Sequence, residues 1–203
     1  MTEAPSGASH SPSVVVLGGP NGAGKSTAAP RLLRGSLRID EFVNADTLAQ
    51  GLSAFRPEDV AIQAARITLA RLDTLASQHR SFAFESTLAS QSLARRLERL
   101  RNAGYTVHVV YLWLPDVDLA VARVAERVRA GGHDMPVDAI RRRYKRGRQN
   151  FFTLYRALAD RWRFYDASSV EGTELAATGG IGVQTRIRLP QTWQAASEGF
   201  DNE

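Results

Sequence analysis

The chain has 203 residues, 43% of them hydrophobic, which is the size and composition of one globular domain with its own core. It contains no cysteine, so disulfide bonds and thiolate metal sites are excluded. No segment approaches the roughly 18 consecutive apolar residues of a membrane span, and the first dozen residues lack the layout of a signal peptide. We therefore expect a cytoplasmic protein without membrane contact, with a disordered leader over residues 1–12.

The predicted secondary structure alternates between strands and helices. In chain order we expect a strand at 13–17, a helix at 28–33, a strand at 38–43, a helix at 57–77, a strand at 81–84, a helix at 89–102, a strand at 105–114, helices at 116–130 and 137–163, and a strand at 163–167. Strands separated by helices imply parallel pairing with right-handed crossovers. The fold class is therefore α/β, with a parallel sheet of about five strands flanked by helices.

The run Gly-Pro-Asn-Gly-Ala-Gly-Lys-Ser-Thr follows the first predicted strand and fits the phosphate-binding P-loop pattern Gly-x4-Gly-Lys-[Ser/Thr]. In such a loop, backbone N–H groups and a helix N-terminus converge on phosphate. The nucleotide-binding candidates are Gly19, Pro20, Asn21, Gly22, Ala23, Gly24, Lys25, Ser26 and Thr27. Lys25 would reach the β- and γ-phosphates of ATP, and the Ser26 hydroxyl would ligate Mg²⁺. The alternative is a glycine-rich turn before an ordinary helix.

Lys25 is one of only two lysines among 26 basic residues. A compact ammonium fits a tight backbone loop, whereas the planar guanidinium of arginine is too wide. We expect Lys25 to be exposed in its loop, so that replacing it leaves the fold intact.

Two carboxylates come just after predicted strands: Asp46 follows the second strand, and Glu85 follows the third. Ligands of an open parallel sheet bind outside the carboxyl ends of its strands, so both residues should face the triphosphate. A carboxylate there can accept the proton of a substrate hydroxyl. The alternatives are that Asp46 caps a helix beginning near Thr47 and that Glu85 pairs with an arginine.

Positive charge is concentrated between residues 121 and 163, where 12 basic and 4 acidic residues give +8 in a chain whose net charge is +5. Three interpretations compete: a solvated helix face, a nucleic-acid-binding stripe, and a mobile lid that brings arginines to a transferring phosphoryl group. The glycine pair at 131–132 could act as a hinge and favours a helical, arginine-rich lid at about 127–148. The basic residues lack interleaved aromatic residues, so nucleic acid is the less favoured partner.

Five further blocks carry a resemblance to a known family. They are Val-Asn-Ala-Asp at 43–46, Phe-Glu-Ser-Thr at 84–87, Glu-Arg-Val at 126–128, Gly-Gly-His-Asp-Met-Pro at 131–136 and Arg-Arg-Tyr at 142–144. Together with the P-loop they resemble the zeta toxin family over about 14–152. That family consists of small P-loop kinases that phosphorylate UDP-N-acetylglucosamine and related UDP-amino sugars, many of them held silent by a small antitoxin.

The resemblance implies roles for individual residues. Lys25 and Ser26 would hold ATP and Mg²⁺, and Asp46 would be the general base. The acceptor-binding candidates are Asn44, Glu85 and Thr87, and the candidates for neutralising the γ-phosphate are Arg127 and either Arg142 or Arg143. The partners implied are a small-molecule hydroxyl acceptor, with a sugar nucleotide favoured, and an antitoxin protein.

We also expect two regions in the chain. Residues 13–170 are expected to form a single-domain P-loop NTPase fold with kinase activity. Residues 171–203 are expected to form a C-terminal extension with an edge strand near 185–189. The chain is shorter than the larger toxins, and its last 35 residues match no part of them that we can place.

The phosphate-binding loop is also compatible with two other functions. One is a kinase for a different hydroxyl acceptor, such as a nucleoside, an antibiotic or another sugar. The other is an ATPase that uses hydrolysis to change conformation. The sequence has no Leu-Ser-Gly-Gly-Gln signature and no apolar strand ending in an Asp-Glu pair, which speaks against the ATPase.

Overall fold

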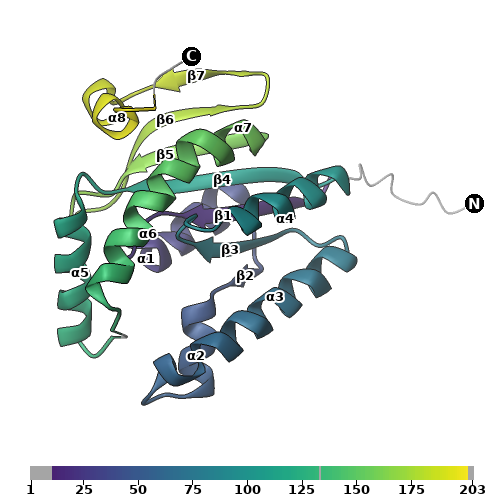
Figure 1. The fold of residues 1–203 in the computed structure, drawn as a ribbon. Coiled ribbons are helices and arrows are strands. Elements are labelled where there is room, and N and C mark those ends of the chain that lie inside the picture. Colours follow the sequence, from purple (N-terminus) through teal and green to yellow (C-terminus); the bar gives the residue numbers. More distant parts are fainter. Residues whose placement is uncertain (1–10, 133, 201–203) are drawn as a thin grey trace, which may run out of the picture.

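One seven-stranded sheet forms the centre of the protein, which is described by a computed structural model over residues 11–132 and 134–200 (Figure 1). The strand order is β2-β3-β1-β4-β5-β6-β7. The strands are β1 (Ser13–Gly18), β2 (Phe42–Val43), β3 (Phe82–Ser86), β4 (Thr106–Trp113), β5 (Arg161–Asp166), β6 (Glu174–Gly180) and β7 (Val183–Ile187). The strands from β2 to β5 in this order pair in parallel. Strand β6 pairs antiparallel with β5 and with β7. The predicted α/β class with about five parallel strands is thus confirmed.

Strand β1 is an interior strand of the sheet, and its side chains are apolar on both faces. Val14, Val15, Val16 and Leu17 are fully buried. The strand pairs with β3 on one side and with β4 on the other. A continuous β-branched run is the sequence pattern of such a doubly covered strand.

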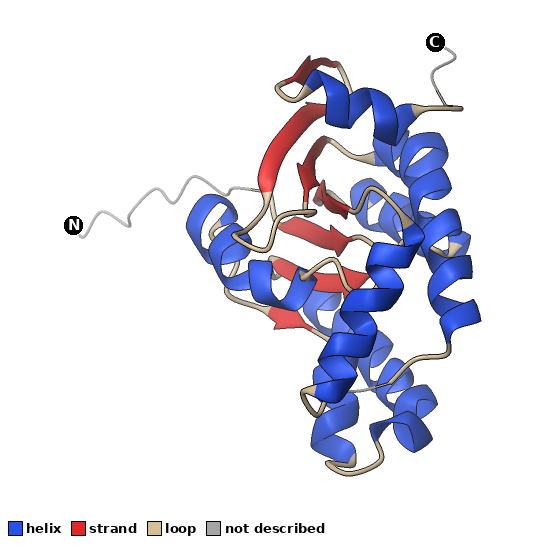
Figure 2. Ribbon diagram, turned by 90° about the vertical axis from the view of Figure 1, so that its left-hand side faces the viewer, coloured by secondary structure: helices blue, strands red, loops and turns tan. Residues whose placement is uncertain are grey.

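Helices cover both faces of the sheet (Figure 2). The helical elements are α1 (Lys25–Ala29), η1 (Pro30–Leu37), α2 (Ala45–Leu52), η2 (Pro57–Val60), α3 (Ala61–Ser77), α4 (Gln91–Asn102), α5 (Val117–Arg129), α6 (Val137–Asn150), η3 (Phe151–Tyr155), α7 (Arg156–Leu158) and α8 (Pro190–Ser197). The core on one face includes α3, α4, η3 and α8, and the core on the other includes α1, η1 and α5. The helices α2 and α3 extend beyond the sheet as an arm (Figure 1).

Several predicted boundaries were wrong. The helix expected at 137–163 ends at Leu158, because residues from 161 onward hydrogen-bond to β4 as strand β5. The strand expected at 38–43 is only two residues long, and helix α2 follows it. The tail contributes two strands, where one edge strand was expected. Residues 1–10 of the predicted leader, and His133 next to the proposed glycine hinge, lie outside the described residues.

Candidate functional site

The loop between β1 and α1 makes two close backbone approaches that only glycine permits. At Gly19, with φ of 137°, an added Cβ would lie 2.4 Å from the carbonyl oxygen of Leu112. At Gly22, with φ of 81°, it would lie 2.8 Å from that of Ala120. Both contacts are with backbone that cannot move aside, so these glycines hold the loop against β4 and α5. The strand–loop–helix context that the motif requires is therefore present.

The side chain of Lys25 is turned into this loop. Its Nζ donates to the carbonyl oxygens of Gly19 and Pro20, both at 2.9 Å, and lies 3.5 Å from Oε1 of Glu85. Only 5% of Lys25 is exposed, so the expectation of an exposed lysine was wrong. Burial lowers the pKa of Lys25, and the nearby Glu85 carboxylate opposes that shift.

Ser26, Asn44 and Glu85 form a hydrogen-bonded cluster beside the lysine. The Ser26 hydroxyl donates to Oε2 of Glu85 at 2.8 Å, and Nδ2 of Asn44 donates to the same oxygen at 2.9 Å. The other end of the amide caps α2, because Oδ1 of Asn44 accepts from the backbone N–H of Asp46 at 2.8 Å. Asn44 therefore performs the capping that was considered for Asp46, and it ties β2, β3 and the loop together.

The donor set of this cluster fits Mg²⁺. A serine hydroxyl and a carboxylate oxygen 2.8 Å apart are hard oxygen ligands, and Mg²⁺ in nucleotide sites uses one or two protein groups together with phosphates and water. The loop also fits a nucleotide phosphate, because it holds the Lys25 ammonium, a cation, at the start of helix α1.

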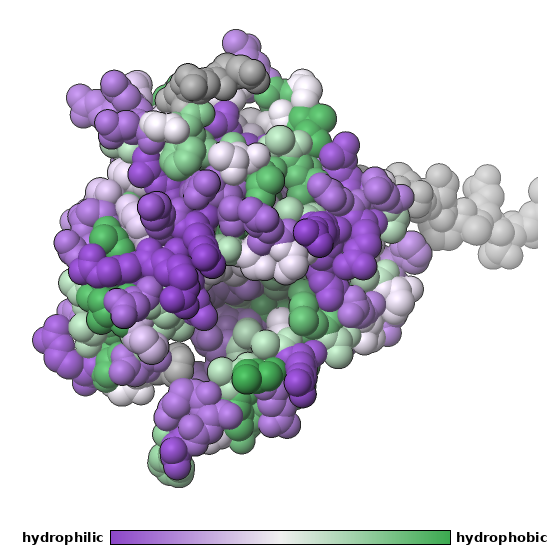
Figure 3. Space-filling view, in the orientation of Figure 1, coloured by the Kyte–Doolittle hydropathy of each residue, from purple (hydrophilic) through white to green (hydrophobic). Residues whose placement is uncertain are grey.

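A cavity of about 470 Å³ opens next to the cluster and is lined by half of the predicted site residues. Its lining includes Asn21, Lys25, Asn44, Asp46, Glu85, Thr87, Arg142, Arg143 and Arg146. These residues come from the loop, from α2, from the end of β3 and from α6. Figure 3 shows a hollow between α6 and the α2–α3 arm, with hydrophilic residues along its α6 side. The sequence reasoning missed Arg146, which lies one helical turn after Arg142 and Arg143 and so shares their face.

The arginines of the basic stretch have different environments. Arg143 contacts the sulfur of Met135 at 2.9 Å within the cavity wall. Arg141 turns away and pairs with Asp118 at 2.7 Å. Arg148 donates to the carbonyl oxygens of Ala196, in α8, and Glu198, just after α8, both at 2.8 Å. Only part of the stretch therefore faces the cavity.

Arg127, on α5, is not among the residues that line the cavity. Burial is the main cause of the lowered pKa of Lys25, and the positive charge of Arg127 adds to that shift. The following glycines end α5: the N–H of Gly131 donates to Val128 at 2.9 Å, and that of Gly132 donates to Arg127 at 2.9 Å. With φ of 85° at Gly131, this is a glycine helix terminus.

The far end of the predicted lid, at α6, is fixed to the loop that follows β3. An added Cβ at Gly147 would lie 2.2 Å from the carbonyl oxygen of Thr87, so the helix touches this loop directly. Nδ2 of Asn150 donates to the carbonyl of Leu88 at 2.7 Å, and Leu88 is buried with φ of 57°. A buried leucine in the left-handed region persists only where its surroundings hold it. Helix α6 therefore positions the cavity loop.

A second cavity, of about 510 Å³, lies on another side of the phosphate-binding loop, and no sequence pattern predicted it. It lies between α1, α5 and residues 167–173 after β5. Nη1 of Arg123 donates to the carbonyl of Ala167 at 2.6 Å, and Nη2 of Arg31 donates to Oγ1 of Thr173 at 2.6 Å. The two arginines therefore hold this loop over the cavity.

The protein has the fold of a P-loop kinase, with a central parallel sheet and a glycine loop that carries a lysine. Two cavities adjoin this loop. Residues 14–154 match the family described as AAA domain, and the chain belongs to that family. It is also 30% identical, over 126 residues, to a protein of Haemophilus influenzae without an assigned function. The match covers 62% of this chain and 88% of that protein.

Solved structures share the fold. The AvrRxo1-ORF1:AvrRxo1-ORF2 complex with sulphate ions superimposes with a TM-score of 0.74 at 14% identity, over 93% of this chain and 64% of the matched chain. The chain thus spans less than two thirds of that relative. A structure from the PezAT chromosomal toxin–antitoxin system of Streptococcus pneumoniae gives a TM-score of 0.65 at 16% identity, over 96% of this chain and 80% of the matched chain. At such low sequence identity, these structural similarities establish the fold alone.

Among the residues described, no helix has both the length and the apolar composition needed to cross a bilayer.

Proposed function

We propose that the protein is an ATP-dependent kinase that transfers the γ-phosphate to a hydroxyl group of a small molecule. The observation that carries the proposal is that one cavity joins the phosphate-binding loop, two carboxylates and several arginines. A volume of about 470 Å³ lies within the range of small-molecule sites, so an acceptor can be held beside the phosphates. The solved complex of AvrRxo1 with ATP shares the fold.

In this proposal Lys25 and the backbone of residues 19–27 hold the phosphates, and Ser26 with Glu85 holds Mg²⁺. When bound, the metal neutralises charge on the phosphate oxygens. The second cavity, between Arg31 and Arg123, takes the nucleoside part of ATP. The hydrogen bond between Ser26 and Glu85 therefore associates Glu85 with the nucleotide, whereas its neighbour Thr87 stays on the acceptor side of the cavity.

Asp46 is the base of the reaction. It is exposed to the cavity, whereas the Glu85 carboxylate is already engaged by Ser26 and Asn44. The acceptor oxygen attacks the γ-phosphorus, its proton passes to Asp46, and the bond between the β- and γ-phosphates breaks to release ADP. Arg142 and Arg143 stabilise the charge of the transferring group from the α6 side, and Arg127 approaches from α5.

The favoured acceptor is a UDP-amino sugar such as UDP-N-acetylglucosamine. Its support is the resemblance of the sequence blocks to the zeta toxin family, together with the fold shared with the PezAT structure. In the same proposal the protein is a toxin held silent by an antitoxin, and residues 13–170 form the kinase domain. Arginines beside Thr87 suit an acceptor that carries phosphate groups.

The test is incubation with labelled ATP and a metabolite extract, followed by incubation with purified UDP-N-acetylglucosamine. We expect label to move to a hydroxyl compound, and ATP turnover to rise when that compound is added. Asp46→Asn should reduce transfer by roughly 10²- to 10⁴-fold with ATP affinity kept, the usual scale for loss of a general base. ATP hydrolysis that no acceptor stimulates would show an ATPase instead.

A further inference from the structure

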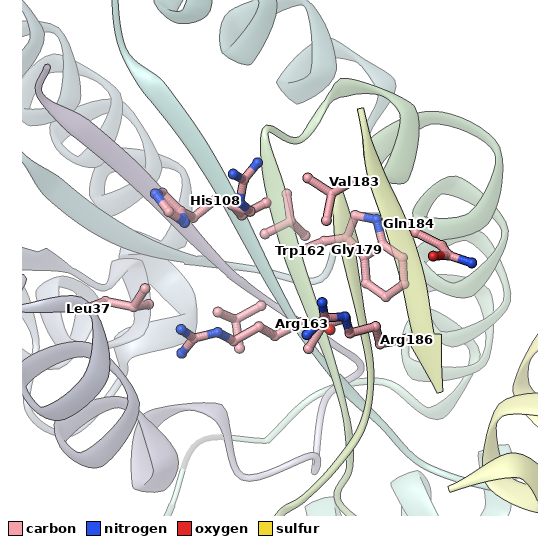
Figure 4. A pocket seen from close by; sticks show the side chains of 12 residues that line it. Leu37, His108, Trp162, Arg163, Gly179, Val183, Gln184 and Arg186 are labelled. Carbon is pink, nitrogen blue, oxygen red and sulfur yellow. The ribbon is translucent and has the colours of Figure 1, made fainter. Parts of the chain in front are cut away.

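A separate hollow of about 410 Å³ lies over strands β4 to β7 (Figure 4). Its lining includes His108 and Val110 of β4 and Arg161 and Arg163 of β5, toward the starts of both strands. The phosphate-binding loop instead follows the end of β1, and no residue lines both this hollow and the cavities of the proposed kinase site. The hollow is therefore a distinct feature of the surface.

Strand register gathers basic side chains in this hollow. Arg163 on β5 pairs with Thr178 on β6, which pairs with Arg186 on β7, so these three residues form one row across the sheet. Arg161 pairs with His108 on β4 and lies two residues before Arg163, on the same face. Gln184 lies two residues before Arg186 and adds an amide group. Two arginines of β5 and one of β7 thus line the same hollow.

The charges of this hollow differ from those of an ordinary solvated surface, where acidic and basic side chains are interspersed. None of the described residues that line it is an aspartate or a glutamate. The nearby Asp160 faces another way: its Oδ2 accepts from the N–H of Val107 at 2.7 Å, and its Oδ1 lies 3.7 Å from Nε of Arg101. The described lining of the hollow therefore carries positive and no negative side chains.

Burial of the imidazole and the charge of Arg163 lower the pKa of His108, and the weaker influence of Asp160 opposes them. The imidazole is consequently neutral near pH 7 and offers one donor and one acceptor. His108 and Arg163 are both half-buried, so their polar groups act in a partly dehydrated setting.

The shape of the hollow selects a compact ligand. Its volume lies within the range of small-molecule sites, and Leu37 and Val183 add apolar surface. A binding site for single-stranded nucleic acid needs exposed aromatic faces along a groove, whereas the one aromatic residue here, Trp162, is 3% exposed. We propose that this hollow binds a small organic phosphate, with Arg163 and Arg186 holding the phosphate and the apolar residues contacting the organic part.

The experiment is calorimetric titration with glucose 6-phosphate in a chloride buffer. We expect Arg163→Gln combined with Arg186→Gln to weaken binding at least ~10-fold, because each loses a charge-assisted hydrogen bond. Arg188→Gln is the matched control, since Arg188 lies just past β7, is exposed and does not line the hollow. It should bind like the wild type. Thermal unfolding of all variants confirms that they are folded.

Phosphate groups also have affinity for the P-loop, so the two sites must be separated. With inorganic phosphate as probe, the wild type should show two sites, and both Lys25→Ala and the double arginine variant should show one. Equal binding by the wild type and the double arginine variant overturns the proposal, as does binding of inorganic phosphate without glucose 6-phosphate or binding of a single-stranded RNA alone. ATP turnover reports the proposed kinase site independently.

Discussion

Gly147→Ala tests whether α6 positions the loop of the cavity. The added Cβ would lie 2.2 Å from the carbonyl oxygen of Thr87, whereas an ordinary contact is at least 3.4 Å, so helix and loop must separate by about 1 Å. Overpacking of this kind costs ~1–3 kcal/mol, and the better helix propensity of alanine returns ~1 kcal/mol. We expect a net loss of up to about 2 kcal/mol in the free energy of unfolding.

The effect on catalysis should exceed the effect on stability. Thr87 and the α6 arginines line the same cavity, and a displacement of about 1 Å can lower a rate by ~100-fold. The measurements are denaturant unfolding and kcat/KM for phosphoryl transfer. Gly51→Ala is the matched control, because Gly51 lies in helix α2 and an added Cβ there meets nothing within 4 Å. It should stabilise the protein by ~0.5–1 kcal/mol. A Gly147→Ala protein with wild-type stability and turnover would refute the reasoning.

Three further predictions follow from the contacts of individual side chains. Lys25→Ala should abolish phosphoryl transfer, and it should also shift the melting temperature because the lysine is buried against Glu85; wild-type turnover would contradict the assignment. Arg142→Ala should lower kcat by ~10³-fold with little change in stability, whereas Arg141→Ala, which removes only an exposed ion pair, should not; equal small effects would contradict the cavity assignment. The pKa of Glu41 is lowered in the folded state, chiefly by its hydrogen bond with an arginine, so its contribution to stability is present above the unfolded-state pKa and is lost as the pH falls through the folded-state value. Glu41→Gln should therefore be less stable than the wild type at pH 7, and this deficit should shrink as the pH falls through the folded-state pKa; a deficit that does not change with pH would show another cause.

The sequence alone determined the parts of this protein that depend on neighbouring residues. A run of β-branched residues followed by a glycine loop and a lysine gave β1, the phosphate-binding loop and α1, because strand propensity, glycine conformation and helix initiation are local properties. The parallel sheet followed from the alternation of strands and helices. The positions of Asp46 and Glu85 after their strands also placed both residues beside the loop.

Only the tertiary structure decided which distant groups meet. The burial of Lys25 depends on Glu85, which is 60 residues away, and Gly147 permits a contact with Thr87 that no local pattern reveals. The long helix predicted through residue 163 ended early because residues from Arg161 onward found hydrogen-bond partners on β4. Similarly, Arg163 and Arg186 face one hollow only because three strands pair in a particular register. Local propensity is set by a few adjacent residues, whereas such pairings depend on the packing of the whole sheet.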